Sequence, residues 1–134
     1  MTQPAIDGSR LNRTLQELGK FGDSPLGMQR VAFSPEDIAG RQYVMSLMGQ
    51  AGLEVRIDEG GNIIGRLPGS VPGLRAIGLG SHTDTVPSGG KYDGALGVMA
   101  ALECAQTLTD NHQTLRHPVE VMVFTNEEGT GFHR

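Results

Sequence analysis

The segment Val119–Phe124 reads Val-Glu-Val-Met-Val-Phe, and this almost unbroken apolar run leaves few folds open to the chain. Such runs are typical of strands that are buried on both faces of a sheet. Residues 95–108 are mostly Ala, Leu, Val and Met, and they predict a helix apolar enough to lie against that sheet. Strand and helix patterns that alternate along one chain predict an α/β fold.

Local signals predict the other elements. The spacing of leucines predicts a short helix over residues 11–21. Ser34 followed by Pro35 predicts the N-cap and first turn of a second helix, and Gly52 stands where its left-handed C-terminal cap would be. The expected strands are a hairpin formed by residues 53–58 and 63–67, and a short strand at residues 75–80.

The composition fits one domain with a modest core and narrows the class of partner. The chain has 134 residues, a net charge of −4 and no run of Lys or Arg, which argues against nucleic acid or an anionic membrane as partner. Its single cysteine, Cys104, cannot form an internal disulfide. With no signal peptide or membrane-spanning stretch in the sequence, we expect a cytoplasmic protein.

Three polar clusters follow places where a strand is expected to end. They are Gly-Ser-His-Thr-Asp-Thr-Val at residues 80–86, a glycine-rich stretch at residues 89–97, and Thr-Asn-Glu-Glu-Gly at residues 125–129. Ligands of open α/β sheets bind outside the carboxyl ends of the strands, so we expect the three clusters to converge there.

The first cluster contains a His-x-Asp pair. Residues two apart in an extended segment point the same way, so the carboxylate of Asp84 can accept a hydrogen bond from one ring nitrogen of His82. The other ring nitrogen is then free to bind a metal ion. A pair of this kind does not by itself establish a metal site.

The other clusters supply carboxylates. Asp93 lies in the turn that opens a helix, where it is either an ordinary N-cap or a ligand, and the surrounding glycines favour the ligand. Glu127 and Glu128 are either two solvated charges or two functional carboxylates. Neighbours on an extended backbone point to opposite sides, so one can bind a metal ion while the other acts as a base. Together with histidine, these carboxylates suit Zn²⁺ or Mn²⁺.

The three clusters resemble the metal motifs of the peptidase M20 superfamily. Their surroundings resemble its N-carbamoyl-L-amino-acid hydrolase and allantoate amidohydrolase (hydantoinase/carbamoylase) branch. The features that suggest this branch are Gly89-Gly90, Asp58, Gly61-Asn62, Arg10-Leu11-Asn12 and residues 33–37. The resemblance implies that residues 1–134 are the N-terminal, metal-binding part of a truncated di-metal α/β catalytic domain, without the family's lid and dimerisation domain.

The resemblance also implies a role for each polar residue. His82 would bind one of two divalent ions, zinc or manganese, Asp93 would bridge both, and Glu128 would bind the second. Asp84 would orient His82, and Glu127 would be the general base. A cis peptide bond after Asp93 is a further expectation from this resemblance.

The activity implied is metal-dependent hydrolysis of a linear C–N bond in a small ureido or amide substrate. An N-carbamoyl-L-amino acid or allantoate is the first expectation, and an M20 peptidase or aminoacylase is the alternative. For a carbamoyl substrate the products would be an amino acid, carbon dioxide and ammonia. The full-length family is expected to form homodimers.

Two departures from the family pattern limit these expectations. Gly131 stands where close relatives often have arginine, and family members are considerably longer and supply further ligands from later sequence. We expect His112, His117 and His133 to be solvent-exposed rather than ligands. The chain alone is therefore expected to bind metal weakly and not to turn over substrate. The non-catalytic alternative is a remnant that binds a partner through an exposed strand edge.

Overall fold

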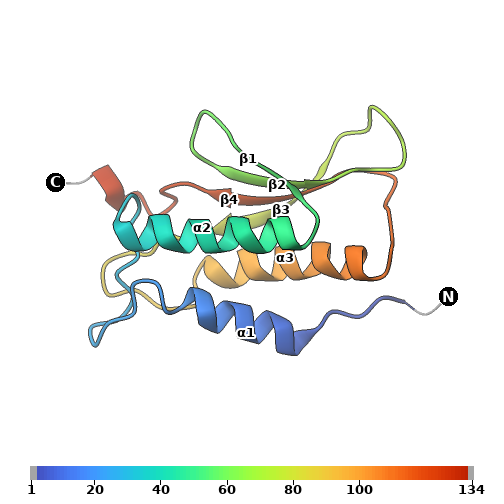
Figure 1. Ribbon diagram of the computed structural model, residues 1–134. Helices are drawn as coiled ribbons and strands as arrows, with labels where there is room; N and C mark the ends of the chain where they lie inside the picture. Colours follow the sequence, from blue (N-terminus) through green and yellow to red (C-terminus); the bar gives the residue numbers. More distant parts are fainter. Residues whose placement is uncertain (1–2, 133–134) are drawn as a thin grey trace.

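The computed structural model describes residues 3–132, which form a four-stranded sheet with helices on one side (Figure 1). The helices are α1 (Gly8–Leu18), α2 (Pro35–Gln50), α3 (Ala95–Asp110) and a short 3-10 helix, η1 (Thr130–Phe132). The strands are β1 (Glu54–Ile57), β2 (Ile63–Leu67), β3 (Ile77–His82) and β4 (Val119–Phe124). The predicted α/β fold is confirmed.

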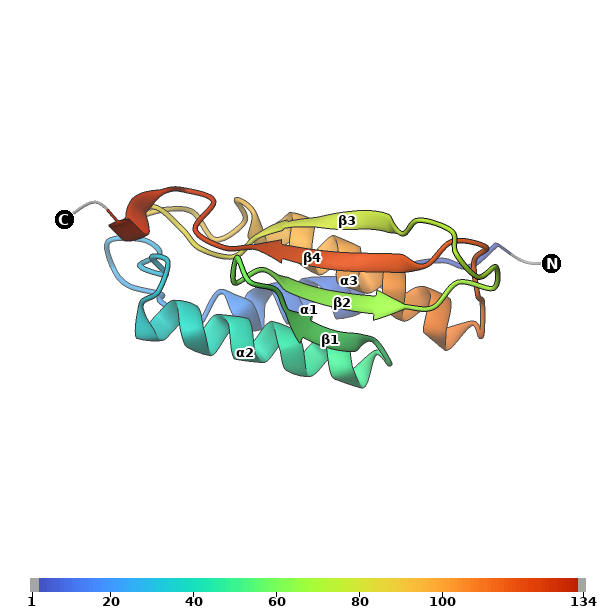
Figure 2. The ribbon, with the colours of Figure 1, turned by 90° about the horizontal axis from the view of Figure 1, so that it is seen from above.

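The strand order decides where the polar clusters lie. The order is β1-β2-β4-β3 (Figure 2), with β1–β2 and β2–β4 antiparallel and β3–β4 parallel. In the parallel pair, His82 at the end of β3 lies opposite Phe124 at the end of β4. The segments that leave these two strands therefore begin side by side, at the left-hand end of the molecule in Figure 1.

The second helix follows its sequence signals closely. The Ser34 side chain accepts a hydrogen bond from the main-chain N–H of Asp37 at 3.1 Å, and Pro35 is the first helical residue. Gly52 has a φ of +84°, the left-handed conformation expected just after the helix. The first helix was predicted too late in the chain, because Asp7 caps it by accepting from the N–H of Arg10.

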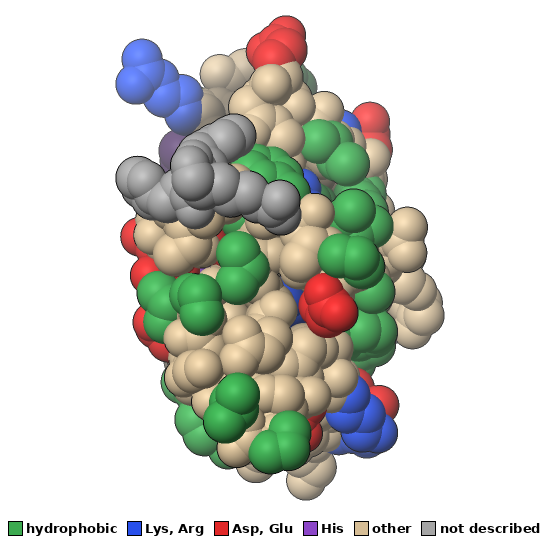
Figure 3. All heavy atoms as spheres, turned by 90° about the vertical axis from the view of Figure 1, so that its left-hand side faces the viewer, with side chains coloured by type: hydrophobic (Ala, Val, Ile, Leu, Met, Phe, Trp, Pro, Cys, Tyr) green, Lys and Arg blue, Asp and Glu red, His purple; other side chains and the backbone are tan. Residues whose placement is uncertain are grey.

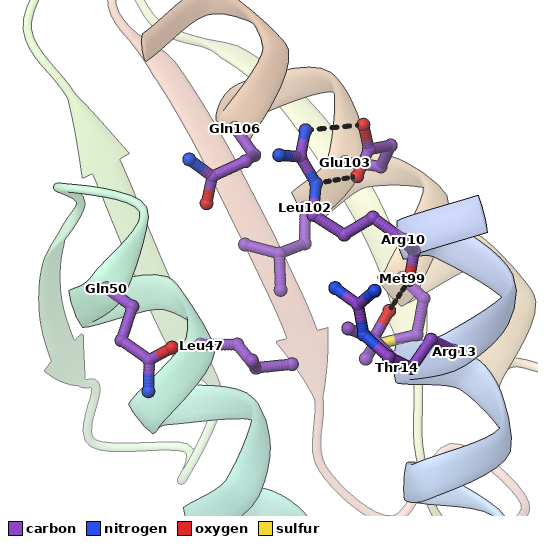
Figure 4. Close-up of a pocket in the computed structure, with 9 residues that line it drawn as sticks. All are labelled: Arg10, Arg13, Thr14, Leu47, Gln50, Met99, Leu102, Glu103 and Gln106. Carbon is purple, nitrogen blue, oxygen red and sulfur yellow. Dashed lines mark hydrogen bonds and ion pairs between the residues drawn. The ribbon is translucent and has the colours of Figure 1, made fainter. Parts of the chain in front are cut away.

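The helices form two layers beneath the sheet. Helix α2 contacts β1 and β2, α3 contacts β3 and β4, and α1 packs below against α3 and α2. A partly buried ion pair joins α1 to α3, where the Arg10 guanidinium donates to both carboxylate oxygens of Glu103 at 2.8 Å (Figure 4). The pair lines a cavity of about 120 Å³ between the helices.

Strand β4 is buried on one face only, which corrects the expectation of burial on both. Val119, Val121 and Val123 are at most 4% exposed, and they alternate with residues that are half-buried or exposed. Phe124, at the end of the strand, is 42% exposed. The physical reason is that all three long helices lie on the same side, so the other side of the sheet has no covering layer among residues 3–132.

Along the described residues, no helix has the length and apolarity that crossing a membrane would require. Residues 3–132 form this single α/β unit, and no lid-like second domain is found among them.

Candidate metal centre

The three predicted metal ligands come together at the carboxyl ends of β3 and β4. One nitrogen of His82 and one carboxylate oxygen each of Asp93 and Glu128 lie within 4.8 Å of one another. His82 is the last residue of β3, Asp93 precedes α3, and Glu128 follows β4. Figure 3 looks onto this end of the molecule, where acidic side chains are visible at the surface. The expected convergence of the three clusters is therefore confirmed.

The imidazole of His82 is oriented by a main-chain carbonyl. Its Nδ1 lies 2.9 Å from the carbonyl oxygen of Asp84, whereas the Asp84 carboxylate oxygen Oδ1 is 3.7 Å away. We predicted that the carboxylate would accept this hydrogen bond, and the geometry corrects that detail. The prediction assumed an extended chain, but β3 ends at His82 and the two residues do not share a strand face. With Nδ1–H donating to the carbonyl, Nε2 presents its lone pair to the site.

The Asp84 carboxylate instead holds the loop that carries the two glutamates. It is 2% exposed and accepts hydrogen bonds from the main-chain N–H groups of Glu127 at 3.3 Å and Glu128 at 3.1 Å. One residue therefore contacts both halves of the site, with its carbonyl on His82 and its carboxylate on the loop after β4.

Asp93 does not act as the cap of the following helix. Gly94 is the N-cap of α3, with a φ of +66° and no side-chain capping bond, so the alternative reading of Asp93 as an ordinary N-cap is not supported. The Asp93 side chain is exposed at the mouth of the site. Residues 3–132 contain no cis peptide bond, so the expected cis bond after Asp93 is absent.

Gly94 is required by the ring beside it. A β-carbon at this position would lie 2.5 Å from both Cε1 and Nε2 of His82 and 2.6 Å from Nδ1. Non-bonded carbon atoms do not approach so closely, so only glycine lets α3 begin against the face of this imidazole.

The adjacent glutamates differ in exposure, but they lie in a turn at residues 125–128 and not on the extended backbone from which their different roles were predicted. Glu127 is exposed, and its Oε2 lies 3.4 Å from Nε2 of His82. Glu128 is half-buried beside Asp93. The pKa of Glu128 is raised, first by burial and then by the negative charge of Asp93 and a hydrogen bond between the two carboxyl groups. Carboxylates this close repel each other unless a proton or a cation offsets their charge.

The hairpin turn between β1 and β2 fixes the start of the glutamate loop. The Asn62 side-chain oxygen accepts from the main-chain N–H of Thr125 at 2.9 Å, and the Thr125 hydroxyl donates to the Gly61 carbonyl at 2.5 Å. Arg41 from α2 donates to the Thr125 hydroxyl and to the Gly61 carbonyl. Asp58 and Gly61-Asn62, which resemble family features, lie between the two strands of the predicted hairpin, and the contacts of Gly61 and Asn62 explain their place near the site.

Sequence reasoning missed two buried charges behind the site. Arg30 is fully buried in the segment between α1 and α2, and it donates to the carbonyl of Thr83 between His82 and Asp84. Asp37 lies in the first turn of α2 and is 3% exposed. The local pattern around Arg30 contains no signal for its burial, because its partners are distant in sequence.

Neither His112 nor His117 is part of the ligand cluster. His112 is exposed as expected, whereas His117 is half-buried and its Nδ1 lies 2.8 Å from the Arg75 carbonyl, contrary to the expectation of exposure. His133 is outside the described residues. Gly131 has a structural reason to lack a side chain, since a β-carbon there would lie 2.7 Å from the ring of Phe33.

Comparison with known proteins identifies the family. The model of peptidase family M28 matches residues 62–132, which is more than half of the chain. The chain belongs to this family of metallohydrolases. The similarity of the chain to hydantoinase/carbamoylase amidases confirms the branch that the motifs predicted. The matching family model is that of peptidase family M28, whereas the motifs suggested the M20 superfamily.

The relatives of this M28 chain are amidohydrolases. It is 43% identical over 128 residues to the "N-carbamoyl-L-amino acid amidohydrolase" of Geobacillus stearothermophilus, covering 95% of this chain and 31% of that protein. It is also 43% identical to the "Ureidoglycolate hydrolase" of Oryza sativa subsp. japonica, covering 95% and 26%. A hydantoinase/carbamoylase family amidase from Burkholderia multivorans aligns with a TM-score of 0.93 and 38% identity, covering 98% and 32%. The chain thus spans between a quarter and a third of the length of these relatives.

Proposed function

We propose that residues 1–134 are the metal-binding part of a di-metal amidohydrolase that cleaves a linear C–N bond in a ureido or amide compound. The observation that carries this proposal is the convergence of His82, Asp93 and Glu128 within 4.8 Å in a chain 43% identical to an N-carbamoyl-L-amino acid amidohydrolase. The similarity of the chain to amidohydrolases is seen both in sequence and in fold.

The donor set fits the ions that the family implies. One imidazole nitrogen and two carboxylates suit Zn²⁺ or Mn²⁺, and the close approach of Asp93 to Glu128 favours a cation between them. His82 would hold one ion, Glu128 a second, and Asp93 would bridge the two. When bound, such ions lower the pKa of a water molecule towards neutrality and polarise the substrate carbonyl.

Glu127 would act as the general base. It is half-exposed, so its carboxylate can reach a water molecule, and it lies beside His82 at the mouth of the site. It would take a proton from the attacking water as the oxygen adds to the carbonyl carbon. It would then give that proton to the leaving nitrogen as the C–N bond breaks. The Asp84 carboxylate accepts a hydrogen bond from the main-chain N–H of Glu127, and this contact limits where the Glu127 carboxylate can lie.

The substrate class rests on the relatives. An N-carbamoyl-L-amino acid is the first candidate, with the amino acid, carbon dioxide and ammonia as products, and allantoate is the second, since the chain is 37% identical to "Allantoate deiminase 1" of Glycine max. A peptidase or aminoacylase activity is the alternative. Turnover would need the rest of the relatives' length for further ligands and substrate contacts, so we expect this chain alone to be inactive. A homodimer of the complete protein and a cytoplasmic location belong to the same proposal.

A non-catalytic binding role has one structural observation in its favour. Strand β3 is an edge strand, and Ile77 on it is 44% exposed, so its free main-chain groups can pair with a strand of another polypeptide. In that case metal binding would be vestigial and no joined protein built on this chain would be active.

The test has two parts. Metal-stripped protein is titrated with Zn²⁺ and with Mn²⁺ by calorimetry, and His82→Ala, Asp93→Asn and Glu128→Gln should each weaken binding, whereas the exposed His112→Ala should not. The chain is then joined to the remaining sequence of the Geobacillus stearothermophilus relative and assayed with N-carbamoyl-L-amino acids and allantoate. Hydrolysis that is lost on Glu127→Gln supports the proposal. Equal metal affinity in all four variants, or a folded and metal-loaded but inactive joined protein, contradicts it.

A further inference from the structure

A buried arginine lies directly behind the candidate metal centre. The Arg30 side chain is fully buried, and its Nε donates to the carbonyl oxygen of Thr83 at 2.7 Å. Its Nη1 donates to the carbonyls of Leu18 at 2.8 Å and Phe21 at 2.7 Å. One guanidinium therefore connects the end of α1 to the segment that follows β3.

The main chain of Arg30 also contacts the segment after β3, on the C-terminal side of Asp84. The N–H of Thr85 donates to the Arg30 carbonyl at 2.8 Å, and Met28 exchanges two main-chain hydrogen bonds with Gly89 nearby. Because β3 ends at His82, the residues that follow it are not paired in the sheet. The stretch around Arg30 supplies main-chain hydrogen bonds to them instead. Both peptide units that flank Asp84 are thus held by a single residue.

The charge of this arginine also has local partners. Asp37 and Asp84 are at most 3% exposed, and both lie close enough to Arg30 to oppose the effect of burial, which lowers its pKa. A buried guanidinium is costly unless hydrogen bonds and opposite charges compensate it. Arg30 has three hydrogen bonds from Nε and Nη1 and two nearby carboxylates, while its buried Nη2 has no hydrogen-bond partner among residues 3–132. The guanidinium also places buried positive charge beside the carboxylate that binds the glutamate loop.

We propose that Arg30 is a positioning residue of the metal centre, which sets the main chain of Thr83 and Thr85 and thereby holds His82 and Asp84 in place. The effect reaches the second half of the site through Asp84, whose carboxylate accepts the N–H groups of Glu127 and Glu128. Arg30 itself is not among the three clustered ligands, so its action is indirect. This inference rests on the proposed metal-binding function.

Lysine cannot replace the whole arrangement. The planar guanidinium presents donors in fixed directions and reaches the carbonyls of Leu18, Phe21 and Thr83 at once, whereas an ammonium is a single point charge on a flexible stem. Arg30→Lys therefore keeps the charge and loses part of the geometry, and Arg30→Met loses both. If Arg30→Lys disturbs the site to a degree between the wild type and Arg30→Met, the geometry of the side chain matters as well as its charge.

The first measurement is amide hydrogen exchange on metal-free protein, comparing Arg30→Met and Arg30→Lys with the wild type. Val44→Ala is the control, because Val44 is a fully buried residue of α2 in the hydrophobic core and is not one of the clustered ligands. We expect the amides of Thr85, Glu127 and Glu128 to exchange at least tenfold faster in Arg30→Met than in Val44→Ala. Arg30→Lys should lie between the two. Protection at the two glutamates equal to that of the control overturns the inference, and Arg30→Lys decides it if Arg30→Met does not fold.

The second measurement is the affinity for Zn²⁺ of the same variants. Loss of a residue that orients a metal ligand typically weakens metal binding 10- to 100-fold, and we expect a loss in this range for Arg30→Met. An affinity unchanged in Arg30→Met but lost in His82→Ala overturns the positioning role alone. If His82→Ala also leaves the affinity unchanged, the proposed metal site has failed, and the exchange of the Glu127 and Glu128 amides still decides whether Arg30 positions this segment.

Discussion

Gly94 packs its main chain flat against the imidazole of His82, so closely that a β-carbon would lie 2.5 Å from Nε2. The φ of Gly94 is +66°, a conformation that other residues adopt only with strain. Two separate constraints, one from the ring and one from the backbone, therefore fall on a single position. The predicted histidine ligand and the start of α3 are fitted to each other.

Gly94→Ala is predicted to displace His82 and to weaken metal binding at least tenfold while the sheet and helices remain folded. The added methyl group must push the ring away, because the nearest atoms belong to the imidazole itself. Calorimetric titration with Zn²⁺ measures the effect, and circular dichroism checks the fold. Gly90→Ala is the matched control, since a β-carbon there meets no atom within 4 Å. Equal affinities of the two variants would show that the ring tolerates the methyl group.

Asp84→Asn is predicted to loosen the glutamate loop. The carboxylate accepts two main-chain N–H groups, and an amide retains only one acceptor oxygen while placing an NH₂ group near the second donor. We expect a 10- to 100-fold loss of metal affinity, as is typical when a residue behind a ligand is changed. Glu54→Gln on β1, an exposed carboxylate, makes the same chemical change far from the site. A loss of affinity no greater than that of Glu54→Gln would contradict the prediction.

The ion pair between α1 and α3 predicts a specific dependence of stability on pH. Burial raises the pKa of Glu103. The hydrogen bonds from Arg10 and from the main chain of Asp7 lower it by more than burial raises it, so the pKa lies below its ordinary value. The stabilisation is therefore complete above the pKa of an unfolded glutamate, about 4.3. It is lost as the pH falls through the lower pKa of the folded state.

Glu103→Gln should accordingly lower the free energy of unfolding at pH 7 by about 2–3 kcal/mol, somewhat less than for a fully buried pair because Arg10 is a quarter exposed. The difference from the wild type should shrink as the pH falls below about 4. Urea unfolding at pH 7 and pH 3.5 measures both. Glu17→Gln removes an exposed pair with Lys20 and should change the free energy of unfolding by less than about 0.5 kcal/mol at either pH. A pH-independent deficit in Glu103→Gln would refute the assignment.

The elements predicted correctly are those whose signals are local. Ser34 caps α2 through a contact three residues away, and the turn between β1 and β2, closed by a hydrogen bond from the Gly61 N–H to the Asp58 carbonyl, follows from its own residues. The clusters after β3 and β4 lie together because these two strands run in parallel and bring their carboxyl ends to one edge. Asp93 instead reaches this edge from the turn before α3, so it does not follow a strand as was expected.

The errors concern features that depend on distant parts of the chain. The apolar run of β4 does not reveal which face the helices cover, and its exposed end at Phe124 has no local mark. The acceptor for the His82 ring depends on where β3 ends, which the His-x-Asp spacing does not encode. Arg30 reaches Thr83 across 53 residues, and only the folded structure brings the two together.

The hairpin turn provides a last test of how the site is held. Asn62 bonds the main-chain N–H of Thr125 and also donates to Asp58, so Asn62→Ala removes two hydrogen bonds and should lower the free energy of unfolding by about 1–2 kcal/mol. Thr125 begins the loop that ends at Glu128, so we also expect metal affinity to fall, by less than in Asp84→Asn because the contact is three residues from the ligand.

Asn111→Ala separates stability from positioning in this case. The Asn111 side chain makes a comparable hydrogen bond to the Thr107 carbonyl at the far end of α3, so its loss should destabilise the chain without affecting the site. Measuring Zn²⁺ affinity and urea unfolding for both variants tests the prediction. If the two lose stability to a similar extent and only Asn62→Ala loses affinity, the turn positions the glutamate loop. If their affinities fall together, the effect is global, and the contact between Asn62 and Thr125 serves the fold rather than the metal centre.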